Sequence, residues 1–204
     1  VACGLLHEKL PVKGVVDGGA AVPSPNVLPA QAKAFGQLVE FLRDRLTHVL
    51  GERGFAYDEV AAAMGADSDS PLAFRAIAAR TAALRGARQE PDFAVVAQAA
   101  KRIANITKGS EAFTFTEVLC TLEAERALRQ AAVTLHDEIL AARASLDFAA
   151  GLHSVRKLAS PLEVFFKDVM VMDPDERLKQ NRIALLQSIQ SEIRWLADLS
   201  QIVV

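Results

Sequence analysis

Signals that begin and end α-helices recur along this 204-residue chain, whereas the alternating pattern of a β-strand is almost absent. Between residues 30 and 50, Phe35, Leu38, Leu42 and Leu46 recur at three- and four-residue spacing, and Gly51 follows them. This spacing is typical of an amphipathic helix that ends at a glycine. The same kind of pattern over most of the chain predicts an all-α bundle of about seven or eight helices with short loops.

Further helix starts are predicted from N-terminal signals. The signals are Asp58 for a helix to Met64, Ser70-Pro71 for a helix to Leu84, Pro91 for a helix to Thr107, Thr114 with Glu117, Ser160 with Glu163, and Asp173-Pro174-Asp175-Glu176 for a final helix to about Leu199.

The first residues differ from the rest of the chain. Residues 1–13 are typical of a helix that runs into a turn, and residues 14–29 are rich in Gly, Pro, Ala and Val. We therefore expect residues 1–29 to be the end of a preceding domain plus a linker, and residues 30–204 to form one helical domain. The initial Val1 in place of a methionine leads us to expect a piece of a longer polypeptide.

The formal net charge of −2 conceals an uneven distribution of charge. Between residues 75 and 108 the charge is +5, and the remainder of the chain carries −7. The basic residues of this segment are Arg75, Arg80, Arg85, Arg88, Lys101, Arg102 and Lys108. Arg75, Arg80 and Arg85 do not share a helix face, so they favour a diffuse positive potential. Such one-sided charge indicates an anionic partner, although a solvated surface remains the alternative.

Few residues favour catalysis or a cofactor. The four histidines are scattered, and the cluster His136-Asp137-Glu138 cannot converge on one metal because adjacent residues of a helix diverge by about 100°. Cys3 and Cys120 predict no disulfide or zinc site and fit a reducing cytoplasm. No glycine loop for phosphate precedes a lysine-bearing helix, and no apolar run is long enough to span a membrane. We expect a chain without catalysis or a metal of its own.

The expected helix from Pro91 to Thr107 has two unlike faces. One face is a normal core face of Val96, Ala99, Ala100 and Ile103. The opposite face carries Gln98, Lys101, Asn105 and Lys108, with Arg102 at its edge. Amide and ammonium groups on one stripe suit contacts to phosphates and base edges. An ordinary solvent-facing stripe is the alternative.

The final helix carries a charge within its apolar stripe. Arg182 lies among leucines and isoleucines, and we predict a buried ion pair with Asp168 or Glu163. Arg177, Lys179 and Asn181 are expected at more exposed positions, and the first two are weaker candidates for RNA contacts. The preceding run from Phe165 to Met172 is expected to be a buried helix in which Met170 and Met172 fill gaps.

Four short motifs follow one another near the end of the chain. They are Phe165–Met172, the acidic turn Asp173–Glu176, Asn181–Ile183, and Ala197–Ser200. Their order resembles the end of the β-subunit of bacterial two-subunit glycyl-tRNA synthetase, although Lys167 and Asp168 stand in the reverse of the usual order. Upstream, residues 41–46 and 101–106 are similar to two further helical steps of this family. The resemblance covers most of residues 30–204.

The resemblance implies an all-helical anticodon-binding domain of the DALR type. It also implies a cytoplasmic heterotetramer in which a separate α-subunit activates glycine with ATP and Mg²⁺, while this chain recognises glycine tRNA through its anticodon arm. Candidate RNA contacts are Lys101, Arg102 and Asn105, followed by Arg177 and Lys179.

Two other functions are consistent with the residues. The segment from Tyr57 to Met64 and the basic helix after Pro71 fit a helix-turn-helix protein that binds DNA. A purely structural helical domain that binds another protein is the second alternative.

Overall fold

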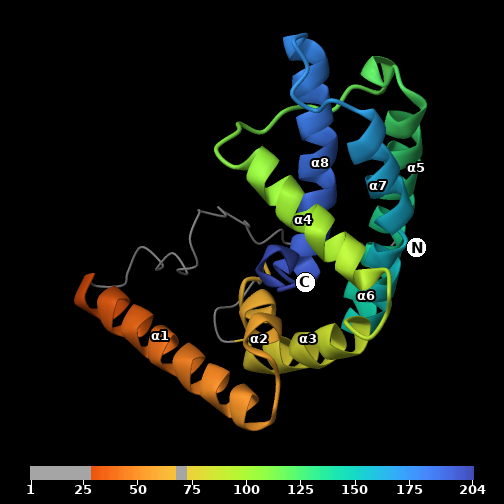
Figure 1. Cartoon of the computed structure of the whole chain (residues 1–204). Coiled ribbons are helices and arrows are strands. Elements are labelled where there is room, and N and C mark those ends of the chain that lie inside the picture. The colour runs from red at the N-terminus through yellow and green to blue at the C-terminus, as the bar shows by residue number, and fades with distance from the viewer. Residues whose placement is uncertain (1–28, 68–72) are drawn as a thin grey trace, which may run out of the picture.

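The computed structural model describes residues 29–67 and 73–204, and within them it is entirely helical (Figure 1). The described part contains eight α-helices, two short 3-10 helices and no strand, so the prediction of an all-α bundle is confirmed. The α-helices are α1 (Pro29–Glu52), α2 (Tyr57–Met64), α3 (Phe74–Ala87), α4 (Phe93–Thr107), α5 (Glu123–Ser145), α6 (Phe148–Arg156), α7 (Ala159–Asp168) and α8 (Glu176–Leu196). The 3-10 helices are η1 (Glu117–Leu119) and η2 (Leu199–Gln201).

The core lies around α8, which contacts α4, α5 and α6 (Figure 1). α7 packs against both α4 and α5, and α3 joins α2 to α6. The largest fully buried side chains include Phe93 of α4, Phe165 of α7 and Leu186 of α8. Burial of these large apolar groups is the main favourable contribution to folding. In the described ranges, no helix is both long and apolar enough to cross a lipid bilayer.

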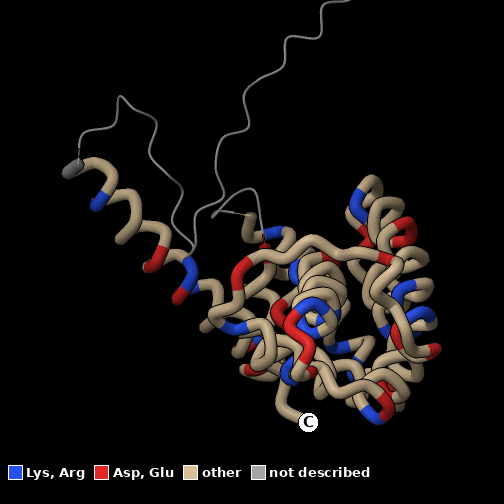
Figure 2. The backbone as a smooth tube through the Cα atoms, turned by 90° about the horizontal axis from the view of Figure 1, so that it is seen from above, with Lys and Arg blue, Asp and Glu red and all other residues tan. Residues whose placement is uncertain are grey.

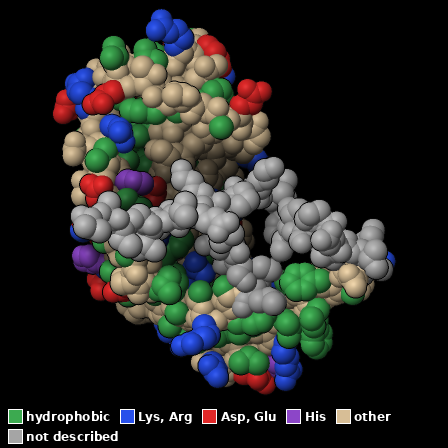
Figure 3. Space-filling view, turned by 180° about the vertical axis from the view of Figure 1, so that it is seen from behind, with side chains coloured by type: hydrophobic (Ala, Val, Ile, Leu, Met, Phe, Trp, Pro, Cys, Tyr) green, Lys and Arg blue, Asp and Glu red, His purple; other side chains and the backbone are tan. Residues whose placement is uncertain are grey.

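Helix α1 projects away from this body and is anchored at its C-terminal half (Figure 1). Leu50 is fully buried, and Arg43 Nη2 donates a hydrogen bond of 2.6 Å to the carbonyl oxygen of Met64 in α2. Phe35, Leu38 and Phe41 are exposed. Figure 3 shows hydrophobic side chains gathered over this helix.

Three predicted helix starts do not coincide with the observed ones. An N-cap residue needs an extended backbone conformation, but Leu158, before α7, is already helical, so Ser160 falls inside the helix. Thr114 lies in a loop and begins no helix; α5 begins at Glu123 instead, where the Glu125 carboxylate accepts the N–H of Leu122 at 2.8 Å. Pro91 lies in a turn two residues before α4, although this helix ends at Thr107 as predicted.

The beginning and end of other elements agree better with the expected ranges. Asp175 caps α8, since its carboxylate accepts the N–H of Arg177 at 2.9 Å, although this helix ends at Leu196 and not at Leu199. The signal Ser70-Pro71 lies outside the described residues, and so does the expected preceding segment and linker apart from Pro29.

The predicted buried helix over Phe165–Met172 is wrong in its second half. α7 ends at Asp168, and Val169 adopts an extended conformation. Side chains of an extended segment point alternately to opposite sides, so Val169 and Val171 are buried while Met170 and Met172 are about 60% exposed. The two methionines therefore do not fill gaps in the core.

Candidate nucleic-acid interface

Helix α4 presents one face to the core and one to solvent. Val96 and Ile103 are fully buried, and Ala99 and Ala100 lie beside them. The polar residues on the opposite side, namely Gln98, Lys101, Asn105 and Lys108, are all exposed. The expected division of this helix into two faces is confirmed, because apolar residues at helical spacing bury one side only.

The three leading candidates share this exposed side of α4 but differ in their contacts. Among the described residues, Lys101 and Asn105 make no side-chain hydrogen bond, ion pair or ring contact. The Arg102 guanidinium lies 4.2 Å from the ring centroid of Phe166 in α7. Stacking of this kind orients an arginine while leaving its N–H groups at the edge free to donate.

The two weaker candidates lie at the start of α8 and are not joined by any described contact to those of α4. Lys179 is already paired, since its ammonium lies 3.1 Å from the Glu176 carboxylate. The hydrogen bond from Lys179 lowers the pKa of Glu176. Arg177 is exposed and forms no ion pair in the described part of the chain. Asn181, expected at an exposed position, is instead only 4% exposed.

Three of the seven basic residues of the segment contribute little to the diffuse positive surface that its charge predicts. Arg80 is buried, donates to the carbonyl oxygen of Trp195 at 3.2 Å and stacks on Phe148. Arg85 stacks on the ring of Phe55, and Arg88 pairs with Asp58. Figure 2 shows Lys and Arg interspersed with Asp and Glu over the chain. These arginines are occupied within the protein because each has a local carbonyl, ring or carboxylate as a partner.

The same contacts weaken the helix-turn-helix alternative. Its basic helix corresponds to α3, which should offer arginines to the DNA major groove. Of the arginines on α3, Arg80 faces the core, and Arg85 donates to the carbonyl oxygen of Gly54. Two of the three arginines of α3 are thus held by groups of the chain itself, and Arg75 is the one left exposed without such a contact to a described residue, so α3 is poorly suited to read DNA.

Arg182 forms the predicted buried ion pair, but its partners are other residues. Its guanidinium donates to Glu125 of α5 and to Asp173, both at 2.6 Å, and to the carbonyl oxygen of Met170 at 3.0 Å. Asp168 and Glu163, the predicted partners, are both exposed.

Electrostatics at Arg182 follow from these contacts. Burial acts to lower the pKa of Arg182, but hydrogen bonds from its guanidinium to Glu125 and Asp173 outweigh burial and raise it. The pKa of Asp173 is lowered by the backbone N–H of Asp175 and by Arg182. These contacts join the start of α8 to α5.

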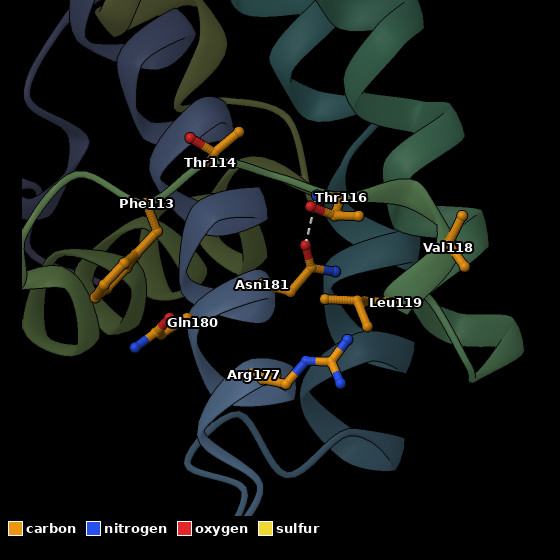
Figure 4. A pocket seen from close by; sticks show the side chains of 8 residues that line it. All are labelled: Phe113, Thr114, Thr116, Val118, Leu119, Arg177, Gln180 and Asn181. Atoms are coloured by element: carbon orange, nitrogen blue, oxygen red, sulfur yellow. Dashed lines mark hydrogen bonds between the residues drawn. The ribbon is translucent and has the colours of Figure 1, made fainter.

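A cleft of about 440 Å³ lies between α8, η1 and the segment before η1 (Figure 4). Phe113 and Thr116 border it from that segment, Leu119 from η1, and Arg177 and Asn181 from α8. Sequence reasoning missed this cleft because its walls are 58 or more residues apart in the chain. The one available signal was the polar pair Asn181-Arg182 inside an otherwise apolar stripe.

The described residues contain no group of three or more His, Cys, Asp or Glu side chains that could hold a metal ion. His136 is paired with Glu192, at 2.8 Å.

Known proteins resemble this chain over most of its length. The model of the DALR anticodon binding domain family matches residues 96–200. The glycine–tRNA ligase beta subunit of Desulforapulum autotrophicum is 39% identical over 170 residues, which is 81% of this chain and 24% of that protein. The proteins of the same name from Moorella thermoacetica and Desulfatibacillum aliphaticivorans are 36% and 31% identical, over 82% and 97% of this chain. The chain spans about a quarter of the length of these relatives.

Proposed function

Because this chain belongs to the DALR anticodon-binding domain family, we propose that it binds the anticodon arm of glycine tRNA as part of the β-subunit of a two-subunit glycine–tRNA ligase. In this proposal a separate α-subunit activates glycine with ATP and Mg²⁺, and the two kinds of subunit form a cytoplasmic heterotetramer. The similarity to relatives named glycine–tRNA ligase beta subunit supports the proposal.

The observation that carries an RNA-binding role is the exposed stripe of α4. Lys101 offers an ammonium without a described partner, Asn105 offers an amide, and Arg102 offers N–H groups held in place by Phe166. Ammonium and guanidinium groups bind phosphates, whereas amides and stacked guanidinium planes bind exposed bases. The buried opposite face keeps the stripe rigid, since Val96 and Ile103 anchor the helix in the core.

This arrangement would hold the tRNA in one position and would not itself take part in the reaction. A rigid helix that holds the anticodon arm in one orientation places the remote end of the tRNA with respect to the rest of the enzyme. Such holding raises the rate of a reaction between bound partners by removing the entropy cost of their encounter.

Exchanging Lys101 for glutamate tests the stripe directly. We expect Lys101→Glu to weaken binding of glycine tRNA and to reduce the slope of log affinity against log salt by about one, because one phosphate contact is lost. Filter binding between about 50 and 200 mM salt measures both quantities. Adding Arg102→Glu should weaken binding further, with the helical circular dichroism unchanged.

Lys33→Glu is the matched control, because Lys33 is also exposed and lies on the projecting helix α1. It should bind like the unaltered chain. Equal affinity and equal salt slope for Lys101→Glu and the unaltered chain would show that the stripe is not the interface. Binding to duplex DNA that tRNA cannot displace would support the helix-turn-helix alternative, and absence of any RNA binding at low salt would support a structural domain.

A further inference from the structure

We propose that the cleft beside Asn181 binds one unpaired nucleotide, whose base offers a hydrogen-bond acceptor to the Asn181 amide and whose phosphate lies at Arg177. This inference rests on the proposed function, since it places an unpaired nucleotide of the anticodon loop in the cleft. It adds a second contact region to the stripe on α4, and it assigns Asn181 a specificity-determining role.

The cleft has the size and the mixed lining of a site for a small ligand. Its volume of about 440 Å³ lies within the roughly 300–1,000 Å³ that such pockets occupy. Phe113 and Leu119 contribute apolar surface, and the polar groups come from α8 and from Thr114 and Thr116. A nucleobase needs both kinds of surface, because it has apolar faces and a polar edge.

The orientation of the Asn181 amide is fixed by its partner. The backbone N–H of Thr116 can only donate, and it donates to Asn181 Oδ1 at 2.6 Å. The amide nitrogen Nδ2 must therefore point away from Thr116, as Figure 4 shows, and it makes no hydrogen bond with any described residue. A side chain that is 96% buried thus presents an unused donor to the cleft. Nδ2 is not among the fully buried atoms that lack a partner, so it reaches the solvent of the cleft and is available to an acceptor on a ligand.

Arg177 supplies a positive charge at the same site. Its guanidinium borders the cleft and lies on the side to which Asn181 Nδ2 points (Figure 4). It forms no ion pair in the part of the chain that the structure describes, in contrast to Lys179, which is held by Glu176. A guanidinium free of carboxylates is suited to a phosphate, to which it can donate two parallel hydrogen bonds.

The cleft is formed before any ligand binds. Two side chains of α8 hold the wall formed by residues 111–116: Asn181 accepts the N–H of Thr116, and Gln187 accepts the N–H of Phe113 at 3.2 Å. Gln187 also donates to the carbonyl oxygen of Glu111 at 2.8 Å. A wall held in this way loses little conformational entropy on binding, which favours affinity and selectivity.

The substitution Asn181→Asp is the sharpest test, because it retains the acceptor for Thr116 and replaces the donor Nδ2 by an acceptor oxygen. We expect affinity for a fluorescent anticodon stem-loop of glycine tRNA to fall about tenfold or more, as measured by anisotropy. Arg177→Gln should weaken binding and reduce the salt slope by about one. Thermal melts show whether each variant is folded.

A rim substitution keeps the test valid if Asn181→Asp fails to fold. Val118 is 91% exposed beside the cleft, so Val118→Glu cannot disturb packing and should weaken stem-loop binding about tenfold by repelling the phosphate. Leu140→Glu adds the same charge at a 47% exposed position of α5, about 25 Å along that helix from its first residue, Glu123, and it should bind within twofold of the unaltered chain.

The outcomes separate the two proposals. If the unaltered chain fails to bind the stem-loop at low salt, the proposed function is wrong and this inference falls with it. A second outcome is that Lys101→Glu weakens binding while the three cleft variants fold and bind normally. In that case RNA recognition through α4 is supported and the cleft is not a nucleotide site. The cleft variants are Asn181→Asp, Arg177→Gln and Val118→Glu. Weakening by the cleft variants but not by Leu140→Glu supports the inference.

Discussion

Arg182 places a permanent charge inside the bundle, where it is only 3% exposed. Removal of one partner from a buried ion pair is far more costly than a surface pair is worth, because the remaining charge loses both its partner and its water. Glu125 is in that position, since it is 1% exposed and accepts Arg182 Nε. Asp173 keeps some access to solvent and is less dependent on the pair.

We therefore expect Arg182→Met to lower the free energy of unfolding by about 3–5 kcal/mol. Urea denaturation followed by circular dichroism measures this change. Lys157→Met is the control: it breaks an ion pair of equal length with Glu138, but half of the Lys157 side chain is exposed, so the loss should stay below about 1 kcal/mol. Equal losses for the two variants would contradict the argument.

Arg182 also illustrates which contacts can be predicted from the sequence alone. An arginine among leucines and isoleucines requires an anionic partner, and this requirement was enough to predict the ion pair. The identity of the partner was not predictable, because Glu125 precedes Arg182 by 57 residues and reaches it only through the packing of α5 on α8.

Helix α5 ends in a conformation that glycine normally adopts. Leu146 follows Ser145 with a φ of 53°, in the left-handed region, and its side chain is 67% exposed. A residue with a Cβ atom pays roughly 1–2 kcal/mol for this conformation. The exposed side chain recovers little of that cost through packing.

Leu146→Gly should therefore raise the free energy of unfolding by about 0.5–1 kcal/mol, since glycine adopts a positive φ freely. Thermal denaturation of the Leu146→Gly variant and of the unaltered chain measures this difference in stability. The matched control is Leu140→Gly in the interior of the same helix, which should lower stability by about 1 kcal/mol because glycine is a poor helix former. Destabilisation by both substitutions would contradict the proposed strain.

The prediction of individual helices was limited because a short sequence pattern can fit more than one backbone conformation. Apolar periodicity located α1, α4 and α8 because each carries three- and four-residue spacing over its length, whereas α2 was located by the start signal at Asp58. Ser160 failed as a start signal because capping depends on the backbone of the preceding residues, which sequence spacing does not specify. Met170 and Met172 failed because a short apolar run looks alike whether it is a helix or an extended segment.

At the scale of the whole molecule, the last described residues pack against α2 and the end of α3. Asp58 of α2 accepts the N–H of Val203 at 2.8 Å and a hydrogen bond of the same length from Arg88. Arg88 in turn donates to the carbonyl oxygen of Val203 at 2.8 Å. Burial acts to raise the pKa of Asp58, but the hydrogen bonds from Arg88 and Val203 outweigh it and lower the pKa from its ordinary value.

A carboxylate with a lowered pKa stabilises the fold above its ordinary pKa, and this contribution is lost as pH falls through the lowered value. Asp58→Asn should reduce the free energy of unfolding by about 1–3 kcal/mol at neutral pH. The difference from the unaltered chain should then shrink as pH falls below about 4. Urea titrations at several pH values measure this, and a difference that does not change with pH would contradict the assignment.

The arrangement of the whole bundle was less predictable than its class. Helical spacing and the absence of strand patterns are enough to predict an all-α chain. The cleft beside Asn181 and the inward direction of Arg80 depend on which helices meet, and that is decided by packing between distant residues. Charge counted along the chain therefore overstated the positive surface.

The arginines that are held by groups of the chain itself also affect non-specific binding to nucleic acid. Guanidinium groups held by the chain's own rings, carbonyls and carboxylates, as at Arg80, Arg85 and Arg88, are unavailable to displace counterions from an arbitrary polyanion. These three side chains therefore add little to non-specific attachment to nucleic acid. Less of the protein is then sequestered on wrong partners, and more remains free to encounter an RNA whose shape it fits.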